Sequence, residues 1–500
     1  MRKLKHLLLM VVLLSVTANL PGQQMPKFEF RGAWLHTVGN QQFKTMSGDS
    51  IRILFSQTLD IFERAGVNAV IFQVRPQADA FYISEIEPWS RFLSGEQGVA
   101  PDPVWDPLQF MIEECHKRGM ELHAWCNPYR VTSNSSEQLH PNHLYFKKPE
   151  IFKKYGPQLY FDPGEPESIE HTVKVISDMV NRYDIDAIHF DDYFYPYPIS
   201  FEEFHDDASF VKYAKEQGFE YWEKGDWRRN NVATLIHRLN DTIKAIKPWV
   251  RFGISPFGIH RNLKDTPDGS GSKTNGLSNY EQLFADVPLW LNNGWIDYNV
   301  PQLYWKIGHP AADYKTLIEW WNGNNFKGHL YIGQNIATFK EPDLDDPSKT
   351  QFGTKMLMNW TLPNVDGNVW WSGWALSRDG AFVDSLATKY QTRPALIPAY
   401  TDIDDVKPFQ VTGLKRRGNE LVWTYDSKGD LMQEALFYAV YHFPRGVVPN
   451  IENGEYLIKV VNKPRYSLPN TPRGRYTYVI TAVDRCRNEG KASKPLNVNN

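Results

Sequence analysis

The sequence has few cysteines, none of the common metal-binding spacings and little net charge. Its 500 residues include only three cysteines, and an odd number without paired spacing predicts no disulfide framework. No CxxC, HExxH or HxH spacing occurs, so we expect neither a metal site nor another cofactor. The formal net charge is −3, which provides no field of one sign to attract nucleic acid or a membrane surface. Cys126 lies in an apolar run and is expected to pack rather than to act as a nucleophile.

Long apolar runs are also absent, apart from a short one near residue 10. Arg2, Lys3 and Lys5 precede the run Leu7–Leu14, and small and turn-forming residues follow it. This pattern predicts a signal peptide over residues 1–24 and export to the periplasm or the cell surface. The run is too short to span a bilayer, and no cysteine near its end offers a lipid anchor. We therefore expect an exported protein without membrane insertion.

Aromatic residues, in contrast, are plentiful. The chain contains 17 Trp, 25 Tyr and 28 Phe residues. Most such rings fill protein cores. Because flat apolar faces also stack on sugar rings, the composition is compatible with a carbohydrate ligand.

Eight short apolar runs alternate with helical segments through the first three quarters of the chain. Strands that alternate with helices form parallel βαβ units, and eight of them predict an α/β fold, a closed (β/α)8 TIM barrel, over residues 28–395. The helix after the fifth strand is hidden, because Arg261–Ser278 is rich in Gly, Ser and Asp. The expected strands are Arg31–Leu35, Asn68–Arg75, Glu121–Asn127, Ala187–Asp192, Arg251–Phe257, Tyr298–Tyr304, His329–Asn335 and Asn368–Ala375, and the clearest helices are Ile51–Ala65, Leu108–Arg118, Glu167–Arg182 and Asn231–Lys247.

The pattern changes after the eighth strand. A stretch spaced by prolines leads, through an expected linker at 396–406, to alternating polar and apolar runs separated by turn signals. Such runs predict a small all-β sandwich over residues 407–500. The segment Tyr476–Asp484 resembles the penultimate strand of fibronectin type III domains, with Trp423 as the core tryptophan. Since those domains commonly act as spacers, we expect a barrel truncated after Pro398 to fold alone.

Polar and aromatic side chains gather where the predicted barrel strands end. Binding and catalytic groups of such barrels lie at the carboxyl ends of the strands, and charged or amide side chains at that depth need partners, which a polar ligand can supply. For the tryptophans, core packing is an equal alternative. His36 and Trp371 also lie at strand ends. The candidate substrate-binding residues are Trp34, Gln73, Arg75, Asp79, His123, Trp125, Asn127, Tyr129, Arg130, His189, Tyr193, Gln302, Tyr304, Trp305 and Trp374.

The pair Asp191 and Asp192 at the end of the fourth strand is the sharpest signal of chemistry. Cleavage of a glycosidic bond typically needs one carboxyl group as proton donor and a second that stabilises or attacks the developing oxocarbenium ion. Adjacent residues of a regular strand point to opposite faces, so either the strand ends between the two aspartates or one of them holds Arg75 or Arg130. The alternative is that both only cap the following loop. Because His189 shares the inward face with Asp191, we expect Asp191 nearest the scissile bond and Asp192 beside it.

Seven segments resemble the glycosyl hydrolase-like family 10 proteins, formerly a domain of unknown function. The segments occur in the family's order over about residues 28–395. That family includes the bacterial divisome-localised glycosyl hydrolase, which cleaves peptidoglycan glycan strands stripped of their stem peptides. The resemblance implies a barrel hydrolase that acts on a cell-wall-type glycan. The segments are Phe30–Trp34, Gln73–Asp79, His123–Arg130, Phe161–Glu167, Asp186–Pro196, Phe252–Gly258 and Asp297–Trp305.

The resemblance places the catalytic acid on the strand-four aspartates and leaves the second catalytic group open. The fifth strand, Phe252–Gly258, lacks the glutamate that serves as acid in many other barrel glycosidases. One interpretation is substrate-assisted catalysis, in which an N-acetyl group of the sugar attacks its own anomeric carbon. Two other functions are alternatives: a non-catalytic glycan-binding protein that uses the same groove, and a scaffold that assembles through the β-sandwich.

Overall fold

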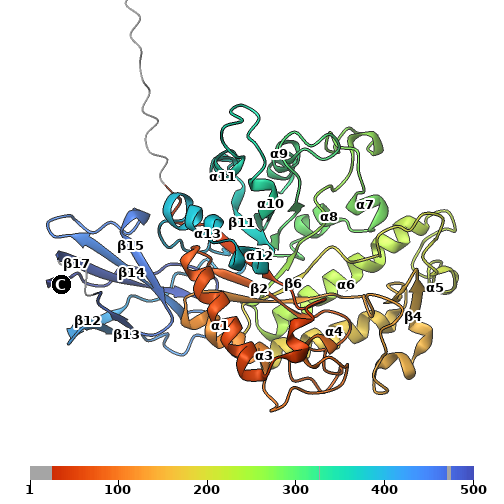
Figure 1. Ribbon diagram of the computed structural model, residues 1–500, viewed down its shortest axis with the longest axis horizontal. Coiled ribbons are helices and arrows are strands. Elements are labelled where there is room, and N and C mark those ends of the chain that lie inside the picture. Colours follow the sequence, from red (N-terminus) through yellow and green to blue (C-terminus); the bar gives the residue numbers. More distant parts are fainter. Residues whose placement is uncertain (1–24, 326, 470–473, 500) are drawn as a thin grey trace, which may run out of the picture.

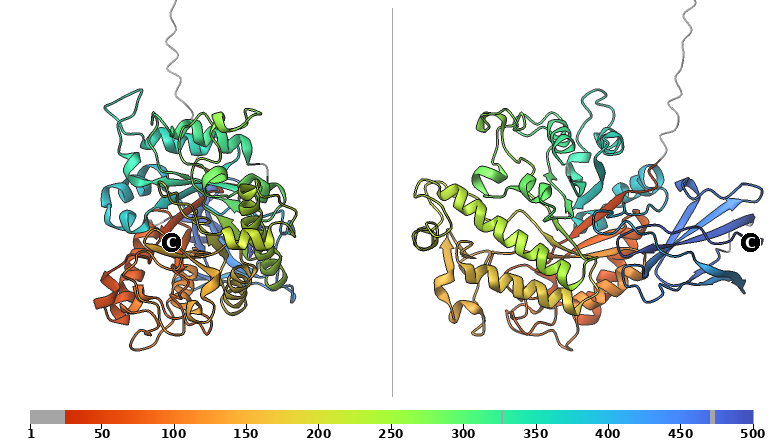
Figure 2. Two further views of the ribbon diagram at one scale, coloured as in Figure 1. Left: turned by 90° about the vertical axis from the view of Figure 1, so that its right-hand side faces the viewer. Right: turned by 180° about the vertical axis from the view of Figure 1, so that it is seen from behind.

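The computed structural model describes residues 25–325, 327–469 and 474–499 of the chain. A barrel of strands surrounded by helices forms the larger body, and a smaller body of strands lies at one end of it (Figures 1 and 2). The predicted signal peptide at 1–24 lies outside the described residues. Within the described ranges, no helix is both long and apolar enough to cross a membrane.

Eight parallel strands close into a barrel, which confirms the predicted fold of the larger body. Each strand pairs with its neighbour, and the last strand pairs with the first. The sixth strand is split into two short pieces at Pro301, because proline cannot donate a ladder hydrogen bond. The barrel strands are β1 (Phe30–Leu35), β2 (Ala69–Arg75), β3 (Glu121–Cys126), β6 (Ala187–Phe190), β7 (Arg251–Ile254), β8 (Tyr298–Asn299) with β9 (Gln302–Leu303), β10 (His329–Asn335) and β11 (Val365–Trp371).

Helices cover the outside of the barrel (Figure 2). They are α1 (Gly48–Arg64), α2 (Arg91–Ser94), α3 (Pro107–Lys117), α4 (Pro166–Arg182), α5 (Asp207–Tyr213), α6 (Lys224–Ile246), α7 (Asn279–Gln282), α8 (Val287–Asn292), α9 (Tyr314–Asn324), α10 (Ile336–Phe339), α11 (Phe352–Thr361), α12 (Gly373–Arg378) and α13 (Gly380–Ser385). Ser47 caps α1 and Asp106 caps α3, each by accepting backbone N–H groups of the first turn. The four helices expected from periodicity are confirmed, although α6 begins earlier because its first turns bury Trp227 against Phe210.

The barrel interior is filled by aromatic and polar rings, where branched aliphatic side chains are usual. Phe30 and Tyr331 stack with ring centroids 4.0 Å apart, and His123 lies 5.5 Å from Phe30. His189 and Tyr298 stack at 5.8 Å. The large apolar core lies instead between the strands and the surrounding helices. Polar rings at the barrel axis need hydrogen-bond partners. His123 and His189 are both hydrogen-bonded to the hydroxyl of Tyr298.

Two antiparallel sheets form the smaller, C-terminal body (Figure 1). Trp423 is buried between them, with its ring centroid 5.4 Å from that of Tyr438. The resemblance of this body to fibronectin type III domains stays a prediction. One sheet contains β12 (Thr412–Arg417), β13 (Glu420–Thr424) and β16 (Arg465–Ser467), and the other contains β15 (Leu457–Val461), β14 (Ala435–Pro444), β17 (Arg475–Asp484) and β18 (Leu496–Asn499); β4 (Phe152–Tyr155) and β5 (Gln158–Phe161) form a separate hairpin.

The segment expected as a linker is packed under the barrel. Tyr400 is 3% exposed, and its hydroxyl lies 2.7 Å from that of Tyr331 inside the barrel. The turn after β17 inserts Arg487, which pairs with Glu121 and Asp186 at the amino-terminal ends of β3 and β6. The sandwich therefore closes the lower end of the barrel, which is a closer association than a spacer requires.

Candidate active site

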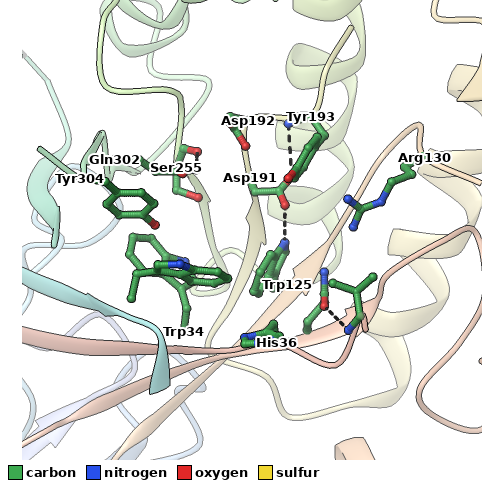
Figure 3. Close-up of a pocket in the computed structure, with 13 residues that line it drawn as sticks. Trp34, His36, Trp125, Arg130, Asp191, Asp192, Tyr193, Ser255, Gln302 and Tyr304 are labelled. Atoms are coloured by element: carbon green, nitrogen blue, oxygen red, sulfur yellow. Dashed lines mark hydrogen bonds between the residues drawn. The ribbon is translucent and has the colours of Figure 1, made fainter. Parts of the chain in front are cut away.

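A pocket of about 350 Å³, whose lining residues are drawn in Figure 3, opens at the carboxyl ends of the barrel strands. This is where (β/α)8 enzymes hold their substrates, and its volume is sufficient for a small ligand group. The sandwich contacts the opposite, amino-terminal ends of the strands. Seven of the eight barrel strands or their loops contribute side chains, so the wall is assembled from distant parts of the sequence. The lining residues are Trp34, His36, Val38, Gln73, Trp125, Arg130, Asp191, Asp192, Tyr193, Ser255, Gln302, Tyr304 and Trp371.

Both aspartates of the acidic pair line the pocket. β6 ends at Phe190, one residue before the pair, so the alternation of a regular strand does not apply to Asp191 and Asp192. Asp191 accepts hydrogen bonds from the indole of Trp125 at 3.1 Å and from the backbone N–H of Tyr193 at 3.3 Å. The hydroxyl of Tyr197 donates to Asp192. The strand therefore ends before the pair, and neither aspartate is withdrawn to hold Arg75 or Arg130.

Burial raises the pKa of both carboxyl groups. Desolvation and the charge of Asp192 raise the pKa of Asp191 to about 8, against the lowering effect of Arg130. The pKa of Asp192 is also raised by burial, but the hydrogen bonds from Tyr197 and Gln302 oppose the rise. Two adjacent carboxyl groups in one pocket resist ionising together. Near neutral pH the pair therefore holds one proton, and the hydrogen bonds favour Asp192 as the ionised partner.

One cation faces the acidic pair. The guanidinium of Arg130 lies 4.6 Å from the ring centroid of Tyr193 and donates to the carbonyl oxygen of Pro76. His36, on the opposite side of the pocket, is neutral near pH 7, because burial and the charge of Arg378 lower its pKa to about 4. Among the described lining residues Arg130 is thus the single permanent positive charge.

Four aromatic side chains form the apolar part of the wall. Tyr304 and Trp371 are nearly parallel, with an interplanar angle of 17°. Trp34 meets the edges of both rings, and Trp125 meets Trp371. An apolar surface beside carboxyl and amide groups suits a sugar ring, which has apolar C–H faces and polar edges.

The structure brings together Trp34, Gln73, Trp125, Arg130, Tyr193, Gln302 and Tyr304 of the predicted binding residues. Arg75 is directed elsewhere: its guanidinium pairs with Glu87 at 2.6 and 2.8 Å and donates to the carbonyl oxygen of Asn127 at 2.5 Å. Asp79 is buried in the loop after β2, where it accepts from Gln77 and Gln97. Neither side chain lines the pocket, because each has found a partner within the protein.

The remaining predicted residues lie outside the pocket lining. Asn127 accepts from Trp125 at 2.9 Å, and Trp374 donates to the carbonyl oxygen of His36 at 2.9 Å. His123 and His189 lie on the barrel axis below the pocket floor. Tyr129 is fully buried, and Trp305 packs against Phe257.

Two lining residues were missed from the sequence. Ser255 directly follows the last residue of β7 and faces the pocket, where its hydroxyl lies 2.9 Å from His189 Nε2. The rule that selected strand ends would have found it. Val38 gives no such signal, because an apolar residue in a loop carries no mark of a binding role.

An acidic and aromatic pocket in the mouth of a (β/α)8 barrel is the arrangement expected of glycoside-hydrolase-like proteins. The family model described as Glycosyl hydrolase-like 10 matches residues 29–350, and the chain belongs to this family.

Two relatives and one solved structure illustrate the likeness. Glycosyl hydrolase YngK of Bacillus subtilis (strain 168) is 40% identical over 485 residues, which cover 93% of this chain and 92% of the relative. Glycosyl hydrolase DigH of Escherichia coli (strain K12) is 35% identical over 367 residues, which cover 68% of this chain and 82% of the relative. The glycoside hydrolase domain of PgaB from Bordetella bronchiseptica has a TM-score of 0.45 at 10% identity, over 73% of this chain and 99% of that chain, a likeness too weak to bear on function.

Proposed function

We propose that the protein is an exported glycoside hydrolase that cleaves peptidoglycan glycan strands lacking stem peptides. The observation that carries the proposal is the pair Asp191 and Asp192, two buried carboxyl groups in one pocket, both with a raised pKa. Such a pair exchanges a proton near neutral pH, as an acid–base catalyst must. Membership of a glycosyl hydrolase-like family supports a glycan substrate, and the predicted signal peptide supports export.

Asp191 is the proposed proton donor and Asp192 the proposed carboxylate. The pKa of Asp191, raised to about 8, keeps it protonated at neutral pH. Asp192 accepts a hydrogen bond from the hydroxyl of Tyr197, which stabilises the ionised form of Asp192. Environments that drive the pKa values of two neighbouring carboxyl groups apart commonly mark an acid and its ionised partner.

The proposed reaction uses the N-acetyl group of the substrate as nucleophile, because both carboxyl groups come from one strand end and do not flank the bond from two sides. Asp191 gives its proton to the glycosidic oxygen while the bond from that oxygen to C1 breaks. The acetamido carbonyl oxygen bonds to C1, and the resulting cation is a cyclic oxazolinium. Asp192 accepts the hydrogen bond of the acetamido N–H. Water then attacks C1, gives its proton to Asp191 and restores the N-acetyl group.

The other lining residues have proposed binding roles. The guanidinium of Arg130 lines the pocket and is placed to meet an anionic or strongly polar substituent of the sugar, such as a carboxylate. The rings of Trp34, Tyr304 and Trp371 offer apolar faces to the sugar. Gln302 can bridge Asp192 and the acetamido group, since an amide both donates and accepts.

Digestion of intact and amidase-treated peptidoglycan, with mass analysis of the released fragments, tests this proposal. We expect fragments from the amidase-treated material and none from intact peptidoglycan, and de-N-acetylated strands should resist cleavage. Release of fragments from de-N-acetylated strands would refute the substrate-assisted mechanism. Calorimetric binding to the treated glycan without any fragment would replace the hydrolase with the glycan-binding alternative.

A further inference from the structure

A chain of hydrogen bonds runs through the centre of the barrel, from the pocket to the sandwich. At the pocket end, His189 Nε2 lies 3.2 Å from Trp34 Nε1 and 2.9 Å from Ser255 Oγ. His189 Nδ1 lies 3.0 Å from the hydroxyl of Tyr298, and the same hydroxyl lies 2.8 Å from His123 Nδ1. One tyrosine hydroxyl thus joins two imidazole rings along the barrel axis.

The lower end of the chain reaches the sandwich. His123 Nε2 lies 2.5 Å from one carboxyl oxygen of Glu121, and the other oxygen pairs with Arg251 at 2.6 Å and with Arg487. Arg487 lies in the turn after β17 and therefore belongs to the C-terminal body. All members of the chain are at most 2% exposed: Trp34, Glu121, His123, His189, Arg251, Ser255, Tyr298 and Arg487.

The groups at the two ends of the chain, the Trp34 indole and the Glu121 carboxylate, determine which atom is the donor in each hydrogen bond. An indole N–H can only donate, so His189 Nε2 accepts from Trp34, and the proton of a neutral ring must lie on Nδ1. The Tyr298 oxygen accepts a hydrogen bond from the Nδ1–H group of His189, and the Tyr298 hydroxyl in turn donates a hydrogen bond to His123 Nδ1. His123 then carries its proton on Nε2 and donates it to the carboxylate of Glu121. In this one arrangement each nitrogen of the two imidazole rings and the Tyr298 hydroxyl meets a group of the opposite kind.

The ionisation states of these side chains agree with hydrogen bonds directed from the pocket toward the sandwich. Burial lowers the pKa of His189 and of His123, so both rings are neutral. Burial alone would raise the pKa of Glu121, but the charges of Arg251 and Arg487 lower it to about 2. Glu121 is therefore a carboxylate and can only accept.

We propose that Arg487 of the sandwich is a positioning residue for the pocket at the far end of the barrel. Together with Arg251, Arg487 holds Glu121 as a carboxylate and so keeps the chain directed from the pocket to the sandwich. The Ser255 hydroxyl then shares the lone pair of His189 Nε2 with the Trp34 indole, at 2.9 and 3.2 Å, and presents its oxygen to the ligand as an acceptor. In the reversed chain His189 Nε2 carries a proton, which opposes the Trp34 indole N–H. The Ser255 hydroxyl then accepts from His189 and turns its own proton toward the pocket or toward the carbonyl oxygen of Phe190 at 3.4 Å. The inference rests on the proposed function only in taking that ligand to be a sugar hydroxyl.

Nitrogen-15 NMR of the histidine rings in the full chain tests the direction without any assay of activity. In the wild type, His189 should be protonated on Nδ1 and His123 on Nε2. In Arg487→Met, and in the nearly isosteric Glu121→Gln, both rings should shift toward the opposite tautomers. Arg485→Met is the matched control: Arg485 lies two residues from Arg487 and pairs with Asp184 at 2.8 Å in the same interface, but it is not a member of the chain.

Turnover of the treated glycan provides the second readout. We expect kcat/KM to fall about threefold to tenfold in Arg487→Met and to stay unchanged in Arg485→Met, since one misdirected hydrogen bond is at stake. Opposite tautomers in the wild type would overturn the proposal, and so would His189 signals in a folded Arg487 or Glu121 variant that match those of the control. The wild-type spectrum decides the direction even where a variant fails to fold. A wild type with the expected tautomers but no turnover would refute the proposed function and leave the chain intact.

Discussion

At the scale of single residues, the pocket contains the carboxyl group of Asp191, whose ionisation lowers the stability of the folded state. Burial and the charge of Asp192 raise the pKa of Asp191 from 3.8 to about 8. The folded state therefore binds this proton more tightly than the unfolded state does. The stability contributed by the protonated group is complete below about pH 4 and is lost as the pH rises through 8. Sites arranged for catalysis often carry such a cost.

The substitution Asp191→Asn should remove that cost. We expect the free energy of unfolding at pH 8 to rise by on the order of 2 kcal/mol and to change little at pH 4, because the amide has no charge to desolvate. Thermal unfolding at both pH values measures the difference from the wild type. Asp241→Asn, at an exposed position on α6, is the control and should change neither value. A variant no more stable than the wild type at pH 8 would contradict the raised pKa.

At the scale of elements, the end of β6 at Phe190 allows both Asp191 and Asp192 to line the pocket. The hydrophobic pattern predicted a strand over Ala187–Asp192, but β6 ends at Phe190. The last residue of a strand depends on its neighbours in the sheet, which periodicity along one chain does not record. The acidic pair was found nevertheless, because the polar ends of parallel strands meet at one face whatever the exact boundary.

The ion-pair partners of buried charged side chains were the second feature that could not be predicted from the sequence. Arg75 was expected to meet the sugar, but it pairs with Glu87 from the loop that follows β2. A buried arginine takes whichever carboxylate the fold brings to it, and spacing along the chain does not identify that group. The eight strands and four main helices were predictable because each repeats a local period. The hydrogen-bond chain was not, since its members come from five different strands and the sandwich.

Gly253 on β7 tests the packing of the barrel interior. A Cβ at this position would lie 1.9 Å from the Tyr298 ring, so Gly253→Ala must displace that ring. We expect a loss of about 3 kcal/mol in the free energy of unfolding, measured by urea titration. Gly323→Ala on α9 is the control, because nothing lies within 4 Å of its Cβ and alanine favours a helix. Equal stability of the two variants would show that the barrel interior is looser than described.

At the scale of the whole molecule, the sandwich completes the barrel. Arg487 pairs with Glu121 and Asp186, both of which are buried at the barrel's lower end, and the hydroxyl of Tyr400 contacts that of Tyr331. Removing one partner of a buried ion pair leaves a charge without compensation. These contacts reverse our expectation, based on the sequence, that a barrel truncated after Pro398 folds alone.

Truncation after Pro398 should therefore produce an unstable barrel. We expect an insoluble product, or a soluble one whose thermal midpoint is lowered by more than about 5 °C, because the loss of the buried ion pairs costs about 3 kcal/mol. Differential scanning calorimetry of the truncated and full-length chains measures this. A truncated barrel with the thermal midpoint of the full chain would show that the sandwich is a spacer.

The central claim is that Asp191 is the acid of a glycoside hydrolase, and turnover of amidase-treated peptidoglycan by Asp191→Asn tests it most directly. The control is Asp162→Asn, which alters another buried aspartate outside the pocket, hydrogen-bonded to Ser209 and to the backbone of Gly164. The account predicts that Asp191→Asn lowers kcat by roughly a thousandfold or more, while glycan binding and the turnover of Asp162→Asn persist. Near-native turnover by Asp191→Asn would contradict the account.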